Sequence, residues 1–164
     1  MTANEICHAL TYSDRSPFFI RSHYVVREVE WGLGFHHRLD LLSIAMDTKI
    51  GTEIEIKISK GDLKRDLEKE HGHYDSRIRQ LYFAGPIELQ EAFFEFAPAE
   101  AGIITVFYDS KRRWYPYQCT IRRRPKPRKS YRPFTDEEIF KLLRLGNMRY
   151  WSQFSKQFRR KSGD

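Results

Sequence analysis

Three patterns of apolar residues predict three consecutive strands in the first half of the chain. Residues 24–31 are rich in β-branched and aromatic side chains. Residues 39–45 form a mostly apolar run, which is typical of a strand covered on both faces. Residues 52–59 alternate cleanly, with isoleucines on one face and charged side chains on the other. Because the links between these segments are short, we expect an antiparallel meander.

A short helix is expected ahead of these strands, over residues 2–11. Thr2 and Glu5 have the spacing of a capping box, in which each side chain bonds to the backbone N–H of the other residue. Apolar residues then recur at helical spacing and give the helix a narrow face for packing.

The middle of the chain predicts a helical crossover into a further strand. Residues 61–80 are charged and helical in character, and the short apolar segment 81–84 precedes Gly85 and Pro86, which we expect to end it. A strand reached through a helix can join the sheet in parallel. The remaining elements expected here are a helical turn at 88–94 and strands at 103–108 and 114–121.

The composition changes at Arg122, where basic residues become interleaved with prolines. Residues 122–134 are therefore expected to form an extended basic connector without core residues. Thr135 and Glu138 have the spacing of a second capping box, which predicts the start of a last helix.

Together these elements predict an α/β fold, a mixed central sheet with an antiparallel hairpin core flanked by helices. The 164 residues suffice for one core and are too few for two ordinary domains. We expect residues 1–121 to form the core, residues 122–134 the connector, and residues 135–164 a C-terminal helix with a basic tail.

Charge and composition narrow the class of protein. The formal net charge of +7 favours a polyanionic partner. No apolar run reaches the roughly 18 residues of a membrane span, and the N-terminus lacks the apolar stretch of a signal peptide. Two cysteines are too few for a disulfide scaffold. We therefore expect a soluble protein of the reducing cytoplasm without a membrane partner, and the oligomeric state stays open, a homodimer included.

Candidate chemistry centres on two acids and a lysine. Asp40 lies in an apolar run, where a carboxylate is costly unless it is paired, hydrogen-bonded or bound to a metal ion. Glu55 and Lys57 stand two apart on the alternating segment, so both emerge on one face. If the strands pair, Asp40 can approach Glu55, and Mg²⁺, which prefers oxygen ligands, would relieve their repulsion. Lys57 could then hold the attacking water and offset charge in the transition state.

Each of these residues also has a purely structural interpretation. Asp40 would bond backbone amides at the start of its strand. Glu55 and Lys57 would form a cross pair on a solvated strand face, and an E-x-K triplet alone is common. Glu5 would only close its capping box.

The order of these features resembles the PD-(D/E)XK nuclease superfamily: a helix bearing Glu, a hairpin with Asp at the start of its second strand, Glu-x-Lys on the third strand, and a helix. The stretch WGLGFHHRLDLL, with TEIEIKISKGDLKRDLEKEHGH and RQLYFAGP, is especially similar to phage-type and MmcB-like members. The segment FTDEEIFKLLRLGNMRYWS resembles the C-terminal part of such proteins.

The resemblance implies a restriction-endonuclease-like fold and hydrolysis of phosphodiester bonds that leaves a 5′-phosphate. It implies Asp40 and Glu55 as ligands of Mg²⁺ or Mn²⁺, Lys57 as the catalytic lysine, and Glu5 as the acid from the first helix. Leu39 holds the place of the family's motif proline, which members of the family often lack.

Other polar residues are weaker candidates. Glu28 and Glu30 are alternatives for the third acid, and Glu53 shares the face of Glu55, where we expect it as an outer neighbour or a ligand. The histidines lack the spacing of a structural zinc site and are expected at the surface or behind the ligands, with metal ligation as the less favoured alternative. They are His36, His37, His71 and His73.

The connector supplies the candidate DNA-binding residues, which would neutralise phosphates and make binding weaken with salt. They are Arg122, Arg123, Arg124, Lys126, Arg128 and Lys129. Tyr131, Tyr150 and Trp151 have two interpretations, stacking on bases or docking of the last helix.

The leading hypothesis is a metal-dependent DNA endonuclease-like protein of DNA repair, recombination or phage DNA processing. The alternative is a nucleic-acid-binding module that retains the fold without catalysis. A third is a protein-interaction role in which the last helix docks onto a partner or a second copy.

Overall fold

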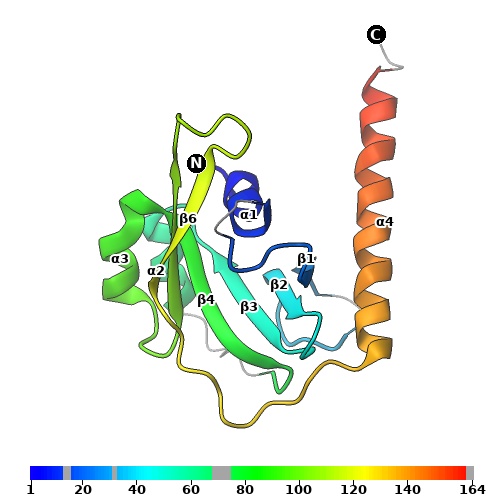
Figure 1. The fold of residues 1–164 in the computed structure, drawn as a ribbon, viewed down its shortest axis with the longest axis horizontal. Helices are drawn as coiled ribbons and strands as arrows, with labels where there is room; N and C mark the ends of the chain where they lie inside the picture. The colour runs from blue at the N-terminus through cyan, green and yellow to red at the C-terminus, as the bar shows by residue number, and fades with distance from the viewer. Residues whose placement is uncertain (13–15, 31–32, 68–74, 162–164) are drawn as a thin grey trace.

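A six-stranded mixed sheet forms the centre of the computed structural model, which describes residues 1–12, 16–30, 33–67 and 75–161 (Figure 1). The helices are α1 (Ala3–Tyr12), α2 (Lys60–Leu67), the single 3₁₀ turn η1 (Ile87–Leu89), α3 (Gln90–Phe96) and α4 (Asp136–Lys161). The strands are β1 (His23–Val29), β2 (Leu39–Ala45), β3 (Gly51–Ile56), β4 (Ile78–Pro86), β5 (Gly102–Tyr108) and β6 (Tyr117–Arg123).

The strands lie in the sheet in the order in which they occur along the chain. β1, β2 and β3 pair antiparallel, β4 is parallel to both β3 and β5, and β6 is antiparallel to β5. The predicted meander and the parallel strand after the crossover are therefore confirmed, as is the α/β class with a mixed sheet flanked by helices.

One face of the sheet is covered by α1. The helix packs buried side chains against strands from β2 to β6, and this cluster includes Ile6, Leu10, Leu41, Ile54 and Ile104. Its N-terminus has the predicted capping box, because the Thr2 N–H donates to Glu5 Oε2 at 2.6 Å and the Glu5 N–H donates to Thr2 Oγ1 at 3.3 Å.

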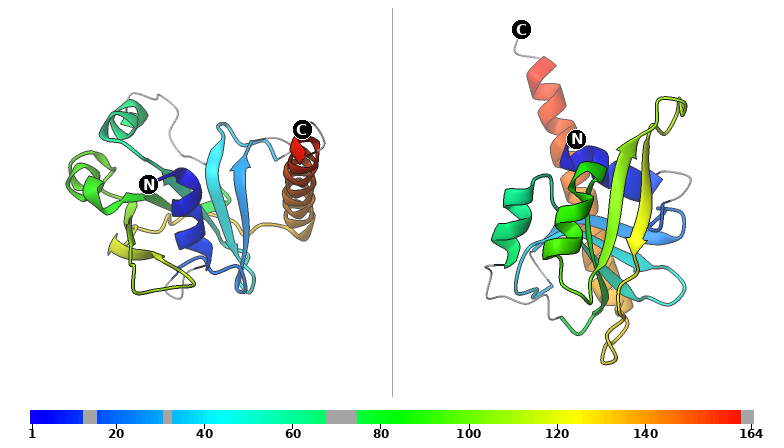
Figure 2. Two further views of the ribbon diagram at one scale, coloured as in Figure 1. Left: turned by 90° about the horizontal axis from the view of Figure 1, so that it is seen from above. Right: turned by 90° about the vertical axis from the view of Figure 1, so that its left-hand side faces the viewer.

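The other face carries two separate apolar clusters. The helices that contribute to them, α4 for one and α2 with α3 for the other, lie toward opposite ends of the sheet (Figure 2). At one end α4 packs on β1 and β2, with Leu42, Ile44, Ile139 and Leu142 buried between them. At the other end α2 and α3 cover β4 and β5 and bury Leu63, Phe83, Phe93 and Ile103. The middle strand β3 therefore lies at the boundary between the two clusters.

Several boundaries differ from those predicted. β3 ends at Ile56, so the expected strand 52–59 is too long, although the Lys57 N–H still donates to the Ala84 carbonyl at 2.9 Å. The helix predicted over 61–80 ends at Leu67 within the described chain, and a strand has begun by Ile78. Pairing of β4 with β3 thus overrides the helical tendency of this charged segment, which has few apolar residues.

Gly85 was predicted to end its strand, and this prediction was wrong. The glycine instead lets β4 pass close to Lys57 and Phe93. β4 continues through Pro86. A Cβ atom at Gly85 would lie 2.3 Å from the Lys57 carbonyl oxygen and 2.7 Å from Cζ of Phe93. Glycine within a strand often marks such a close approach of another segment.

The connector is more structured than predicted. Arg122 and Arg123 belong to β6, and Pro125 and Phe134 are buried, Phe134 within the cluster under α4. The segment between them follows the edge of β4, where the Arg128 N–H donates to the Arg79 carbonyl at 2.9 Å. The prediction of a connector without core residues was therefore wrong. The sequence did not reveal them because the apolar residues of the connector are scattered between charged ones and follow no helical or strand pattern.

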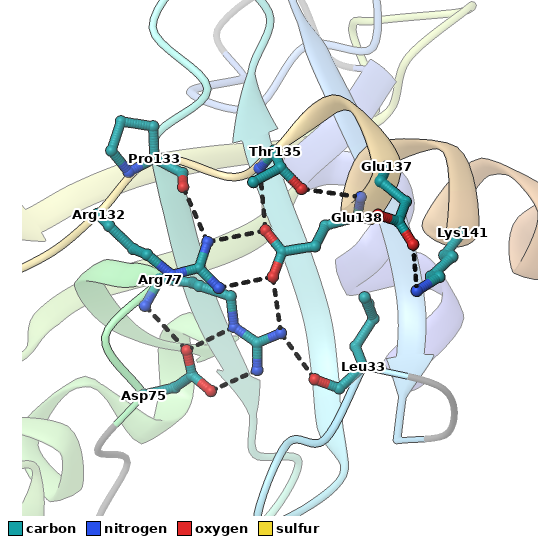
Figure 3. Close-up of polar contacts among 9 residues, drawn as sticks. All are labelled: Leu33, Asp75, Arg77, Arg132, Pro133, Thr135, Glu137, Glu138 and Lys141. Carbon is teal, nitrogen blue, oxygen red and sulfur yellow. Dashed lines mark hydrogen bonds and ion pairs between the residues drawn. The ribbon is translucent and has the colours of Figure 1, made fainter.

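Arg77, just before β4, joins the segment that leads into β4, the loop before β2 and the first turn of α4 (Figure 3). Its guanidinium donates to the Asp75 carboxylate and to the Leu33 carbonyl, lies 3.4 Å from Glu138 Oε1, and stacks 4.1 Å from the centre of the Phe35 ring. This buried arginine is thus satisfied by charge, hydrogen bonds and an aromatic face together.

The last helix begins as predicted and is long. Thr135 and Glu138 form the capping box, and Arg132 donates two further hydrogen bonds to the Glu138 carboxylate at 2.8 and 2.6 Å (Figure 3). The helix continues to Lys161, and its C-terminal half extends beyond the sheet (Figure 1). Across the described ranges, no helix combines the length and the apolar character needed to cross a membrane.

Candidate active site

Glu55 and Lys57 form a buried ion pair at the C-terminal end of β3. The Lys57 ammonium lies 2.9 Å from Glu55 Oε2, and the two residues are 4% and 3% exposed, respectively. The ring of Phe83 lies 5.9 Å from the ammonium group. The interpretation of these residues as a cross pair on a solvated face is therefore wrong. This face of β3 is buried between α4 on one side and α2 with α3 on the other.

The register places the acids of β3 between the two apolar clusters, on the face opposite α1. Glu53 is paired with Leu42 on one side and Leu81 on the other, and Glu55 is paired with Phe83. Paired residues on neighbouring strands point to the same face. Leu42 belongs to the cluster under α4 and Phe83 to the cluster under α2 and α3, so the acids occupy the gap between them.

Asp40 lies next to this pair at the start of β2. Its Oδ2 atom accepts a hydrogen bond of 2.9 Å from the backbone N–H of Ile56, the residue after Glu55. The β2–β3 pairing includes Leu41 with Ile54, and continuing that register sets Asp40 opposite Glu55. One oxygen of Asp40 therefore bonds a backbone amide, as the structural interpretation predicts. Asp40 also lies opposite Glu55, as strand pairing predicts.

Two residues that sequence analysis ranked low join the site. The Nε2 atom of His37 lies 2.8 Å from Oε1 of Glu53, which is only 1% exposed. Ligand atoms of His37, Glu53 and Glu55 all lie within 4.8 Å of one another. His37 comes from the loop before β2. It is 16 residues from Glu53 in the sequence, and this separation matches no local pattern that would predict their contact.

The site has an unfilled acceptor that suits a cation. Oε1 of Glu55 is buried and has no hydrogen-bond partner among the residues that the structure describes. A buried carboxylate oxygen in this state is costly, and a divalent ion coordinated by carboxylates would remove the cost. The chemistry of the donor set therefore fits a divalent metal ion.

The electrostatics of the site agree with this fit. Burial raises the pKa of Glu55 above its ordinary value, the charges of Asp40 and Glu53 raise it further, and the Lys57 ammonium opposes them. The main cause is the loss of water around the Glu55 carboxylate, to which the two neighbouring carboxylates add. A bound cation would favour the ionised form of Glu55.

The structure does not bring Glu5 to these acids. Its carboxylate closes the capping box and accepts a hydrogen bond from the Tyr117 hydroxyl on β6. The hydrogen bond from Tyr117 is the main cause that lowers the pKa of Glu5. α1 packs on the face of Ile54, whereas Glu55 points to the other face.

The remaining acid and histidine candidates lie elsewhere. Glu28 and Glu30 are exposed at the sheet edge, and His36 is exposed next to His37. His71 and His73 fall outside the described residues.

The candidate DNA-binding residues divide into two groups. Three arginines donate hydrogen bonds within the fold: Arg122 to Thr105 Oγ1, Arg123 to the carbonyls of Ala101 and Pro98, and Arg128 to the carbonyls of Asp75 and Ile78. The other three are exposed, as Arg122 also is, and are Arg124, Lys126 and Lys129. Tyr131 lies 4.8 Å under the guanidinium of Arg79, so it already has a stacking partner.

Comparisons with known proteins give no further guide to the class of this site. A scan of protein-family models found no match, and searches of curated proteins and of solved structures also found none. The functional argument therefore rests on the residues themselves.

Proposed function

We propose that this protein is a metal-dependent phosphodiester hydrolase that acts on DNA and has a restriction-endonuclease-like fold. The observation that carries the proposal is the buried Glu55 carboxylate, which has one oxygen on the Lys57 ammonium and the other without a partner. Structural ion pairs normally satisfy both oxygens, so an unfilled acceptor beside a lysine points to a ligand.

The roles follow from the positions of the residues. Asp40 and Glu55 would hold Mg²⁺ or Mn²⁺, which when bound supplies an activated water and neutralises phosphate charge. With the ion bound, the Lys57 ammonium would orient the attacking water and offset the charge that develops on the phosphate oxygens. The hydrogen bond from the Ile56 N–H holds Asp40 at the end of β2, so its carboxylate is fixed before any ligand arrives.

The order of the elements supports the same proposal. Helix α1, the three-stranded meander, α2 and the parallel strand β4 follow one another as the resemblance to PD-(D/E)XK nucleases requires, with the acids at the expected ends of β2 and β3. This agreement concerns topology, and a fold alone does not specify an activity.

DNA is the proposed substrate because of the exposed basic side chains. Arg124, Lys126 and Lys129 are exposed along one segment that follows the sheet edge, and the chain carries a net charge of +7. Phosphate contacts of this kind position a duplex without reading its sequence. DNA repair, recombination or phage DNA processing are the settings in which we expect such an activity.

Nuclease assays with matched variants test the proposal. Linear, supercoiled and single-stranded DNA are incubated with the protein and Mg²⁺ or Mn²⁺, and the product ends are analysed for 5′-phosphate. We expect cleavage that is abolished by EDTA and reduced at least about a hundredfold by Glu55→Gln or Lys57→Met. Glu91→Gln, at an exposed position of α3, is the control and should cleave normally. Cleavage by the two site variants at the control's rate would refute the proposal.

The second candidate function is a DNA-binding module without catalysis. It is favoured because polar groups of the site already have partners within the fold. One oxygen of Asp40 accepts a hydrogen bond from the Ile56 N–H, and the Lys57 ammonium pairs with the Glu55 carboxylate. In that case DNA binding is salt-sensitive, EDTA leaves it unchanged, and no cleavage product forms with any metal ion.

A further inference from the structure

We infer that His37 and Glu53 coordinate the same divalent ion as Glu55, and that this mixed nitrogen and oxygen donor set selects a transition metal ion over Mg²⁺. The inference deepens the proposed function and rests on it only for the statement that the ion serves hydrolysis. Neither His37 nor Glu53 belongs to the D…E-x-K pattern of the sequence.

The geometry of the three side chains fits one ion. Metal–ligand bonds to imidazole nitrogen and carboxylate oxygen are about 2.1 Å long. His37 Nε2 and Glu53 Oε1 are 2.8 Å apart, as for neighbouring ligands of one ion, and all three ligand atoms lie within 4.8 Å. An ion at this point would replace the direct contact between His37 Nε2 and Glu53 Oε1.

Burial supplies the independent evidence for a ligand at this cluster. Glu55 Oε1 is buried without a hydrogen-bond partner in the described part of the chain, and it belongs to the same cluster. Glu53 and Glu55 are both almost wholly buried, whereas the His37 side chain keeps 22% of its surface exposed. The histidine therefore marks the side from which an ion can enter.

The donor set decides the preferred metal. Mg²⁺ binds oxygen ligands and gives up its water reluctantly, so an imidazole contributes little to its affinity. Imidazole nitrogen suits first-row transition metal ions, and Mn²⁺ also accepts carboxylates. We therefore expect Mn²⁺ to bind more tightly than Mg²⁺, with Zn²⁺ also accepted.

Direct metal binding tests this inference without a cleavage assay. The full chain is stripped with chelator and titrated with Mn²⁺ or Mg²⁺, with calorimetry and the electron paramagnetic resonance of Mn²⁺ as readouts. We expect His37→Ala and Glu53→Gln each to weaken Mn²⁺ binding at least about tenfold. His36→Ala, which changes the exposed neighbouring histidine, is the matched control and should bind as the wild type does.

The outcomes separate this inference from the proposed function. Unchanged Mn²⁺ affinity in His37→Ala, or equal affinity of the wild type for Mg²⁺ and Mn²⁺, would overturn the inference even if DNA is cleaved. Mn²⁺ binding that depends on His37 would support it even if no DNA is cleaved, and in that case the nuclease proposal fails alone.

A second inference rests on a different observation, the exposed apolar stripe of α4. The stripe is Phe140, Leu143, Asn147, Tyr150 and Phe154, spaced by three and four residues in turn. Phe140 is 68% exposed and Tyr150 is 59% exposed. The adjacent face of the helix packs on β1 and β2 through Ile139 and Leu142, and Arg149 donates to the carbonyls of β1.

We propose that this stripe binds α4 of a second copy of the chain in antiparallel orientation. Spacing by three and four residues keeps one seam facing a partner helix, and one Asn at an apolar seam fixes register. Charge also matches an antiparallel pair: the first turn carries Asp136 and Glu137, and Lys156 lies toward the other end of the helix. Asn147 lies at the centre of the stripe, so two copies would bring their Asn147 side chains together.

Solution mass under two salt conditions tests the dimer. We expect the full chain to have about twice its monomer mass by light scattering, at low and at high salt, because apolar contact dominates the seam. Leu143→Glu combined with Tyr150→Glu should give the monomer with an unchanged circular dichroism spectrum, since both side chains are exposed. Met148→Glu, at an exposed apolar position outside the stripe, is the control and should leave the dimer intact. A wild-type monomer at about 100 μM, or dissociation by Met148→Glu, would refute this proposal.

Discussion

The Lys57 ammonium and the Glu55 carboxylate are 2.9 Å apart in a region where both side chains are at least 95% buried. Removing one member of a buried pair leaves an uncompensated charge, which costs about 3–5 kcal/mol. We therefore expect Lys57→Met to lower the free energy of unfolding by this amount, and Lys57→Met with Glu55→Gln to recover part of it. Urea denaturation of the two variants measures both effects.

An exposed ion pair provides the comparison. Lys60 and Glu95 lie 3.3 Å apart with more than half of each side chain exposed. Pairs of this kind contribute about 0–1 kcal/mol, so Lys60→Met should change stability little. If Lys57→Met costs no more than Lys60→Met, the pair at the site is not buried in solution.

The start of α4 should make the protein sensitive to acid. The hydrogen bonds from Arg132 lower the pKa of Glu138 to about 2, from an ordinary value of 4.5. A lowered folded-state pKa stabilises the fold above pH 4.5, and this contribution is lost as the pH falls from about 4.5 to about 2. Thermal unfolding of the wild type at pH 7 and pH 3 should show the loss.

Glu138→Gln isolates this contribution. The variant should be less stable than the wild type at pH 7, and the difference between them should shrink at pH 3. Glu137→Gln, in the same turn, is the control for removal of an acidic group. A difference between Glu138→Gln and wild type that stays constant with pH would contradict the assignment.

Gly85→Ala should disturb the site from the neighbouring strand. The added Cβ would lie 2.3 Å from the Lys57 carbonyl oxygen, so β4 or the end of β3 must move. We expect a loss of about 1–3 kcal/mol, the range for overpacked sites, together with weaker Mn²⁺ binding. Gly61→Ala in α2, where a Cβ meets only the Ser59 hydroxyl at 4.0 Å, should instead be neutral or stabilising. Equal stability of both variants would show that the close approach is absent.

The connector variants should separate stability from DNA binding. Arg128→Ala removes hydrogen bonds to the carbonyls of Asp75 and Ile78 and should destabilise the fold by about 1–3 kcal/mol. Lys129→Ala should leave stability unchanged, weaken DNA binding, and reduce by about one the slope of log affinity against log salt. Fluorescence anisotropy at several salt concentrations, with thermal melts, provides the measurements. Normal DNA binding by Lys129→Ala would remove the connector from the proposed interface.

Local patterns were sufficient for much of the fold. The alternation of residues 52–59 and the apolar run 39–45 predict paired strands, and the spacing of Thr2 with Glu5 and of Thr135 with Glu138 predicts the two helix starts. These signals are local because a strand face, a covered strand and a capping box each depend on residues only two or three positions apart. They also predict that Glu55 and Lys57 share a face.

The composition of the site depended on contacts between distant segments. The sequence alone determined the order of the elements, the basic charge, and the juxtaposition of Asp40 with Glu55 through strand pairing. Only the tertiary structure decided that this pair is buried between two apolar clusters, that His37 and Glu53 lie beside it, and that Glu5 points elsewhere. The physical reason is that burial and coordination depend on which helix covers which part of the sheet, and side chains from separate segments meet only after that packing is complete.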